Sequence, residues 1–188
     1  MKRKRYEEFL AKNILLKCYR LKYKNLDVAD KPDLQSETYG IEVSILINPN
    51  DMKSRKTNID IKNKLYLKEF LYNNISKGYC ENATYQELEK AIKIKVKKTQ
   101  SYSKQTYLEL FIFNCCYPIY NHNKKELLNY FTTLFKKIDK KRMYSTFFYY
   151  ELGRLLIVDL VNYKISQIII GSIELMQLIT ETNMEINQ

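Results

Sequence analysis

The feature that most constrains the fold is a run of β-branched and apolar residues at 41–47, Ile-Glu-Val-Ser-Ile-Leu-Ile. Such a run is typical of a buried strand. Pro32 and Asp33 precede it, and because Pro lacks an N–H and fixes its own φ, this pair suits the start of a strand. The polar residues between them, with Gly40, predict a turn. The stretch therefore predicts a β-hairpin with Asp33 on its first strand and Glu42 on its second.

Glu42 is the one charge in the second strand, and a buried carboxylate is costly unless it is paired or binds a cation. If the hairpin loop is Glu37-Thr38, Asp33 and Glu42 lie opposite each other with Cβ atoms roughly 5 Å apart. Two carboxylates at this short distance from each other can bind a divalent cation well. A one-residue slip places them on opposite faces. Because Tyr39-Gly40 is the better turn dipeptide, the sequence leaves the register open.

This arrangement resembles the PD-(D/E)xK nuclease superfamily, which has the restriction-endonuclease-like fold. The matching residues are Pro32-Asp33, then Glu42-Val43-Ser44 after a short hairpin. The resemblance implies that Asp33 and Glu42 ligate Mg²⁺ (or Mn²⁺). Ser44 stands where the family has a Lys that helps to activate the attacking water. Within this resemblance, either another Lys of the chain takes over that role or catalysis has been lost. The competing interpretation is an ordinary edge hairpin with two unrelated carboxylates.

The first helix is expected at residues 6–21, where apolar residues recur at helical spacing. Its stripe consists of Leu10, Ile14, Cys18 and Leu21. At about 100° per residue Glu7 falls on the same stripe and Glu8 points away. Many relatives of the nuclease fold carry an acidic residue on the first helix that reaches the metal, so the resemblance implies Glu7 as a third ligand, with Glu8 in reserve. The alternative is that Glu7 only stabilises the first helical turn.

Residues 51–104 are expected to form a basic helical insertion within a single domain that covers residues 1–188. Helices are predicted at 64–74 and 84–98, the second with Thr84 and Glu87 as a capping box. The apolar stripe of the second helix consists of Leu88, Ala91, Ile92 and Val96. Lysines spread around its C-terminal half at positions 90, 93, 95, 97 and 98. They either face phosphate or only complement the helix dipole. A Lys of the 51–64 segment is one candidate to replace the family's Lys, which is absent at position 44.

The remaining segments predict the other half of a sheet. Residues 107–115 are apolar at nearly every position, as in a central strand covered on both faces. An amphipathic helix is expected at 124–138, then strands at 147–150, 155–160 and 165–170, and a helix at 173–179. The fold class is therefore α/β (α+β), with a central mixed sheet flanked by helices. The order agrees with the restriction-endonuclease-like core if a helical insertion is allowed.

Composition favours a polyanionic partner. The 188 residues contain 32 Lys and Arg against 21 Asp and Glu, a net charge of +11. Nucleic acid is the leading partner for such a chain, and a Lys-rich surface set by codon usage is the alternative. Abundant Lys, Asn, Ile and Tyr fit an AT-rich genome, bacterial or of a mobile element.

The four Cys show no CxxC pair and no nearby His, which argues against a zinc site and makes the reducing cytoplasm the natural compartment. No apolar run is long enough for a transmembrane helix, so no membrane partner is expected.

Two functional hypotheses follow. The first is a Mg²⁺-dependent, nuclease-like protein that cleaves or only binds nucleic acid, a metal-dependent phosphodiesterase if it is an enzyme. In it Gln35 and Ser44, which lie beside the acids, hydrogen-bond the attacking water, and nearby lysines neutralise phosphate. The second is a non-enzymatic interaction or regulatory protein of a bacterial host or mobile element, with a protein or RNA partner.

Overall fold

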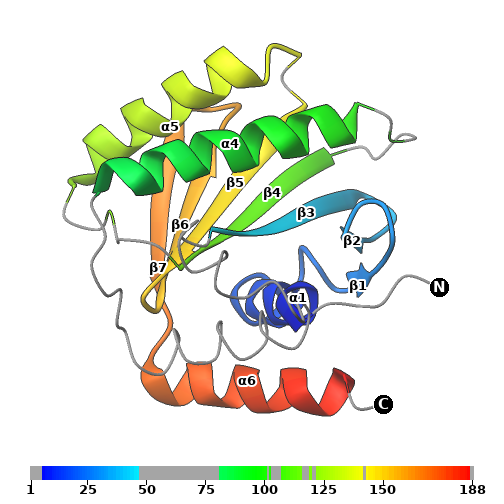
Figure 1. The fold of residues 1–188 in the computed structure, drawn as a ribbon. Coiled ribbons are helices and arrows are strands. Elements are labelled where there is room, and N and C mark those ends of the chain that lie inside the picture. The colour runs from blue at the N-terminus through cyan, green and yellow to red at the C-terminus, as the bar shows by residue number, and fades with distance from the viewer. Residues whose placement is uncertain are drawn as a thin grey trace, which may run out of the picture.

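The protein forms a mixed sheet of seven strands with helices on both faces (Figure 1). The computed structural model describes residues 6–46, 81–100, 102, 107–115, 119, 122–141 and 143–186. Its elements are α1 (Tyr6–Cys18), β1 (Asp27–Val28), β2 (Leu34–Gln35), β3 (Tyr39–Leu46), α4 (Glu81–Thr99), β4 (Tyr107–Asn114), α5 (Lys124–Ile138), β5 (Tyr144–Glu151), β6 (Arg154–Asp159), β7 (Lys164–Ile169) and α6 (Ser172–Ile186).

The strands lie in the sheet in the order in which they occur in the chain. β3, β4 and β5 are parallel, and every other neighbouring pair is antiparallel. Parallel neighbours need a crossover connection, and α4 and α5 lie in the two connections of this kind. The expected class, an α+β chain with a mixed sheet flanked by helices, is confirmed. The central position predicted for residues 107–115 is also confirmed, because β4 has three strands on either side.

Two apolar layers cover the sheet. α4 and α5 pack on one face, and α1 and α6 pack on the other (Figure 1). Side chains alternate between the faces along a strand. On β3, Ile41 and Val43 therefore belong to the α1–α6 layer, whereas Leu46 belongs to the α4–α5 layer. The same alternation places Glu42 on the face that α4 covers.

Most of the predicted elements are found, with differences at their ends. α5 has the predicted bounds, and Leu127, Phe131, Leu134 and Phe135 are buried on its inner face. The helix predicted at 84–98 begins at Glu81, so Thr84 lies inside it, buried, and the capping-box prediction is wrong. α1 ends at Cys18 and Leu21 is 94% exposed, so the apolar stripe of the observed helix ends one turn before the predicted end. The predicted helix at 64–74 and the basic segment at 51–64 lie outside the described residues.

Candidate functional site

The β2–β3 hairpin has the register that brings the two acids together. Leu34 pairs with Ile41 and Gln35 pairs with Gly40. The Ser36 N–H donates to the Tyr39 carbonyl at 2.8 Å, which leaves Glu37 and Thr38 as the loop. The Ser36 hydroxyl also accepts from the Tyr39 N–H at 3.0 Å, and this bond stabilises the loop although Glu37-Thr38 is not a favoured turn pair. Of the registers that the sequence left open, the structure has the one in which Asp33 and Glu42 face each other, since the same register continued by one residue joins them.

Both acids are buried. Asp33 stands directly before β2, and its Oδ2 accepts from the Val43 N–H at 2.9 Å, so its carboxylate supplies an acceptor to the edge of β3. Glu42 lies on β3 with no exposed surface, beneath α4. Two carboxylates this deep need cationic partners, because the desolvation of an unpaired buried charge is very costly.

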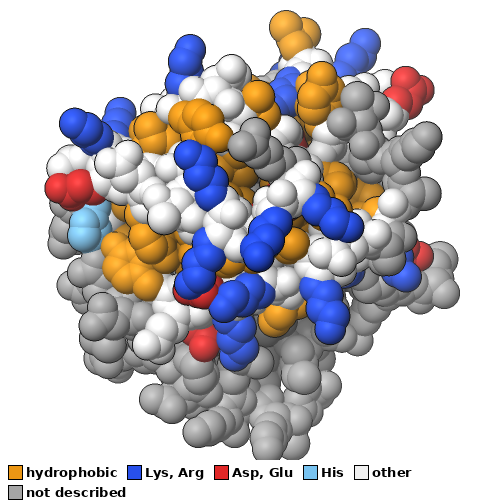
Figure 2. Space-filling model, turned by 90° about the horizontal axis from the view of Figure 1, so that it is seen from above, with side chains coloured by type: hydrophobic (Ala, Val, Ile, Leu, Met, Phe, Trp, Pro, Cys, Tyr) orange, Lys and Arg blue, Asp and Glu red, His pale blue; other side chains and the backbone are white. Residues whose placement is uncertain are grey.

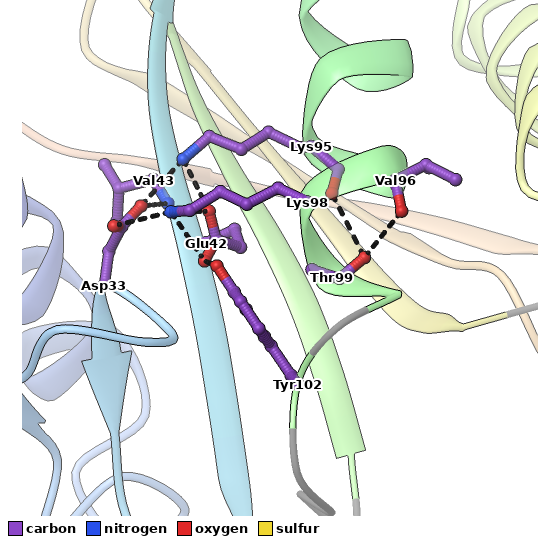
Figure 3. A network of polar contacts seen from close by, with 8 residues as sticks. All are labelled: Asp33, Glu42, Val43, Lys95, Val96, Lys98, Thr99 and Tyr102. Carbon is purple, nitrogen blue, oxygen red and sulfur yellow. Dashed lines mark hydrogen bonds and ion pairs between the residues drawn. The ribbon is translucent and has the colours of Figure 1, made fainter.

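Two lysines from α4 supply those partners (Figure 3). The Lys95 ammonium lies between the acids, with Nζ 2.7 Å from Asp33 Oδ2 and 2.6 Å from Glu42 Oε2. Lys98 follows three residues later on the same side of the helix, with Nζ 3.3 Å from Asp33 Oδ1 and 2.9 Å from Glu42 Oε2. Two carboxylates and two ammonium groups thus form a compact cluster with no net charge.

The sequence of α4 explains how the lysines reach the acids. Leu88, Ile92 and Val96 are buried against the sheet at helical spacing, as predicted. Lys95 and Lys98 fall on one side of this stripe at about 100° per residue, so their side chains leave the helix at the border of the apolar layer and are 11% and 33% exposed. The Thr99 hydroxyl then donates within the last turn, toward the Lys95 carbonyl at 3.1 Å and the Val96 carbonyl at 3.0 Å.

Tyr102 completes the cluster just beyond the end of α4. Its hydroxyl donates to Glu42 Oε1 (Figure 3). Burial, followed by the hydrogen bond to the Glu42 carboxylate, raises the pKa of Tyr102 above its ordinary value, so the phenol stays protonated at neutral pH. Tyr102 therefore acts as a hydrogen-bond donor that holds one oxygen of Glu42.

The charges in the cluster fix the protonation states. Burial alone would raise the pKa of Asp33, but the charge and hydrogen bond of Lys95, then the Val43 N–H and Lys98, lower it to about 2. Burial alone would lower the pKa of Lys98, yet its hydrogen bonds with Tyr102 and Glu42 and the charges of both acids raise it. At neutral pH Asp33 is ionised and Lys98 is protonated. Lys98 is thus suited to neutralising negative charge, and it is not a free amine that attacks a substrate.

The other residues predicted for the site lie apart from the acids. Ser44 is half-buried on the same face of β3 as Glu42, and Gln35 is exposed on β2. No bond from either side chain to Asp33 or Glu42 is found among the described residues. The roles assigned to Gln35 and Ser44 therefore remain predictions.

Glu7 belongs to a helix that covers the other face of the sheet. It lies in the first turn of α1, whose buried residues pack on the face of the sheet opposite to Glu42. Within the described ranges, no group of three or more His, Cys, Asp or Glu residues is placed to hold a metal ion. The structure thus gives no support to Glu7 as a third ligand. The expectation that Glu8 points away from the core is wrong, because Glu7 and Glu8 are both buried.

Sequence reasoning missed the specific roles of Lys95, Lys98 and Tyr102. It identified the lysines of α4 as a group but did not separate them. One signal was present in the helical period: at about 100° per residue, Lys95 and Lys98 fall on one side of the apolar stripe, whereas Lys90, Lys93 and Lys97 fall farther round the helix on its other side. A helix that crosses over a strand with a buried Glu can place such bordering residues near that Glu.

A second buried Glu offers a comparison on the other face of the sheet. Glu109 of β4 accepts from the Tyr23 hydroxyl at 2.6 Å and from the Lys22 ammonium at 2.8 Å. The Lys22 ammonium also lies 4.9 Å from the ring centroid of Tyr23 and 4.8 Å from that of Tyr39. In the described part of the chain this carboxylate contacts one ammonium group, that of Lys22, and it anchors the segment after α1 to the sheet.

Comparisons with known proteins identify no relative. No protein-family model matches the chain, and no curated protein and no solved structure gives a significant match. Among the described residues, no helix is both long and apolar enough to cross a membrane.

Proposed function

We propose that this protein is a Mg²⁺-dependent, nuclease-like protein that acts on the phosphodiester backbone of nucleic acid through Asp33, Glu42, Lys95 and Lys98. The observation that carries the proposal is the position of Lys95, whose Nζ lies within 2.7 Å of an oxygen of each acid. An acid pair on a hairpin with an adjoining Lys is the residue set of the PD-(D/E)xK superfamily. Lys95 comes from α4 rather than from position 44, where this chain has Ser.

The acid pair suits Mg²⁺ chemically. Mg²⁺ prefers oxygen ligands and is commonly held by one or two carboxylates, with water and substrate phosphate completing its shell. Asp33 and Glu42 offer such oxygens, and the Lys95 ammonium between them indicates that this position favours a cation. When bound, Mg²⁺ would lower the pKa of a water and stabilise negative charge on the scissile phosphate.

The chain's own residues have distinct tasks in this proposal. Lys98 has the most exposed side chain of the four, at 33%, so we assign it the contact with phosphate. Lys95, at 11% exposed, stays beside the acids and orients them. Tyr102 keeps the Glu42 carboxylate in place through its hydroxyl. A charged donor aimed at a phosphate in such a dry site is worth more than in water.

A second candidate is a protein that binds nucleic acid, or a regulatory partner, without cutting. One observation favours it: all four oxygens of Asp33 and Glu42 already accept hydrogen bonds from Lys95, Lys98, Tyr102 or the Val43 N–H. A metal that binds here has to displace an ammonium group. If displacement does not occur, the cluster only joins α4 to the hairpin.

A cleavage assay separates the two candidates. Labelled DNA and RNA strands are incubated with Mg²⁺ or Mn²⁺ and the wild type, Glu42→Gln or Glu109→Gln; the last variant removes a buried charge from the opposite face. We expect cleavage by the wild type and Glu109→Gln and a loss of about 100-fold in Glu42→Gln. No cleavage by the wild type, or equal cleavage by Glu42→Gln, would contradict the nuclease proposal.

We also propose that the protein works in a reducing compartment such as the cytoplasm. The four Cys of the sequence include no CxxC pair and have no His nearby, so they do not form a recognisable zinc or redox motif. Cys115 is buried at the end of β4, where it packs as a small apolar side chain.

A further inference from the structure

The acid pair is recessed beneath the end of α4. The side chains of Glu42 and Asp33 are 0% and 5% exposed, and that of Lys95 is 11% exposed. The most exposed of the four charged side chains is that of Lys98, at 33%. Because both acids are covered, a phosphate that reaches Glu42 must leave the surface of its own molecule to do so.

This depth discriminates between nucleic-acid forms. Duplex DNA is stiff, with a persistence length of about 150 bp, and its phosphates lie on the outside of a wide cylinder. Drawing one nucleotide out of the stack costs a few kcal/mol. A single strand bends freely at each nucleotide and needs no such step. A recessed site thus favours an unpaired strand or strand end.

An exposed row of lysines leads along α4 to the site. Lys90, Lys93 and Lys97 are exposed and recur at helical spacing on one side of α4, and Lys97 is followed by Lys98. Seven residues of helix span about 10 Å, near the rise of three nucleotides at roughly 3.4 Å each. Figure 2 shows Lys and Arg side chains gathered over this face. The helix dipole explains cations in the last turn only, so it does not explain Lys90 and Lys93.

The neighbouring helix extends this cationic surface. Glu89 Oε1 lies 2.6 Å from the Lys93 ammonium and 3.2 Å from the Lys137 ammonium of α5. One carboxylate is therefore shared by two lysines in an exposed position, and a positive charge remains. A phosphate arriving there would meet two ammonium groups that are already held close together.

Aromatic side chains lie farther along α4, away from the acid pair. The rings of Tyr85 and Tyr130 are 4.6 Å apart, and the ring of His122 is 6.3 Å from that of Tyr85. All three residues are half-buried, and Tyr85 and Tyr130 also pack against the apolar layer beneath α4 and α5. Figure 2 shows the His side chain (pale blue) beside apolar side chains at the border of this face. Unpaired bases stack on such rings, whereas paired bases do not present their faces.

Together these features identify a substrate class. We infer that the protein binds a single-stranded nucleic acid, with its phosphates along Lys90, Lys93 and Lys97 and its bases toward Tyr85 and Tyr130. The direction of the bound strand, past Lys98 to the acid pair, rests on the proposed function. Beyond that function, the inference specifies that the substrate is single-stranded and names the surface that binds it.

The test is a binding measurement that does not depend on cleavage. Fluorescence anisotropy is recorded in EDTA with labelled oligothymidylate and with a duplex of equal length, over a series of salt concentrations. The variant is Lys90→Gln/Lys93→Gln/Lys97→Gln. The matched control is Lys17→Gln/Arg20→Gln/Lys24→Gln, which removes the same charge from residues that line a cavity between α1 and α6 on the opposite face.

The wild type is expected to bind the single strand about tenfold more tightly than the duplex. The α4 variant should lose about tenfold in single-strand affinity, and the slope of log K against log salt should fall in magnitude by about 2, as expected for three lost phosphate contacts. The control should retain most of the affinity. Equal losses in both variants, tighter binding of the duplex, or no binding by the wild type would overturn the inference.

The two proposals fail separately. Because EDTA removes divalent metal, strand binding in this assay does not require the acid pair. A protein that binds strands along α4 but never cleaves them would contradict the nuclease proposal and leave this inference standing.

Discussion

At the scale of single residues, the site depends on how deeply each lysine of α4 is placed. Lys95 is the deeper of the two that contact the acids, at 11% side-chain exposure, and it bridges both carboxylates. Lys97, two residues later, is exposed. Breaking a buried ion pair costs far more than removing an exposed charge, because the remaining partner stays desolvated.

Lys95→Met should therefore destabilise the protein by about 3 kcal/mol, because it leaves two buried carboxylates with fewer partners. Lys98→Met should cost less, since Lys98 is more exposed. The control Lys97→Met should change the free energy of unfolding by no more than about 0.5 kcal/mol. Urea denaturation followed by circular dichroism measures all three. If Lys95→Met is no worse than Lys97→Met, the cluster does not stabilise the fold.

The lowered pKa of Asp33 predicts a dependence of stability on acid. Its pKa is about 2 in the folded chain against an ordinary value of 3.8. The ionised form is thus favoured by folding, and its contribution is present above pH 4 and lost as the pH falls toward 2. The loss should be roughly 2 kcal/mol. Urea unfolding of the wild type between pH 5 and pH 2 should show it, and Asp33→Asn should lack that part of the slope.

Sequence reasoning predicted the acids better than the lysines for a physical reason. Asp33 and Glu42 belong to one hairpin, so a two-residue loop is enough to bring them together. Lys95 comes from another element, and its position depends on how α4 crosses over β3. The buried stripe of α4 was predictable from its helical period. The period does not tell which part of the sheet this stripe packs on.

At the scale of elements, the turn between β5 and β6 shows what a tight connection requires. Leu152 and Gly153 form it with φ of 47° and 74°. A Cβ on Gly153 would lie 3.0 Å from the Ile170 carbonyl oxygen, and the Ile170 N–H donates to the Gly153 carbonyl at 2.7 Å. This turn thus joins the β5–β6 hairpin to the start of α6.

Gly153→Ala is expected to lose about 1–2 kcal/mol of stability, because Ala resists a positive φ and its methyl group meets backbone. Gly171→Ala is the matched control, since the nearest atom to an added Cβ there is a flexible Glu174 oxygen at 3.8 Å. Its free energy of unfolding should change by no more than about 0.5 kcal/mol. Thermal and urea unfolding decide the matter, and equal effects at both positions would refute the role assigned to the turn.

Helices were predicted well where a single period ran through them and less well at their ends. α5 has a continuous apolar stripe and Asn123 as its N-cap, with the Asn123 side chain accepting from the Glu126 N–H at 2.9 Å. α4 extends three residues before Thr84, because local capping preference is weaker than tertiary packing. The same competition ends α1 at Cys18.

At the scale of the whole molecule, the sheet separates two surfaces with different character. The α4–α5 face carries the acid pair, the lysine row and the half-buried aromatic rings. The α1–α6 face carries Glu109, which is buried with its own Lys partner. This division provides an internal control for the central claim, because Glu109 and Glu42 are both buried carboxylates on neighbouring strands.

The most direct test of the acid pair is thermal unfolding with and without millimolar Mg²⁺ or Mn²⁺. A metal that binds only the folded chain must raise the midpoint by mass action. For a chain of this size, about 1 kcal/mol of binding energy corresponds to roughly 3 °C. Three proteins are compared: the wild type, Asp33→Asn/Glu42→Gln and Glu109→Gln, each against its own midpoint without metal.

We expect metal to raise the midpoint of the wild type and of Glu109→Gln by a similar amount and to leave that of Asp33→Asn/Glu42→Gln unchanged. That result would identify the facing carboxylates of the β2–β3 hairpin as the metal site. If the wild type does not respond, or if the double variant responds as strongly as the wild type, Asp33 and Glu42 hold only Lys95 and Lys98, and the account of a metal-dependent nuclease is wrong.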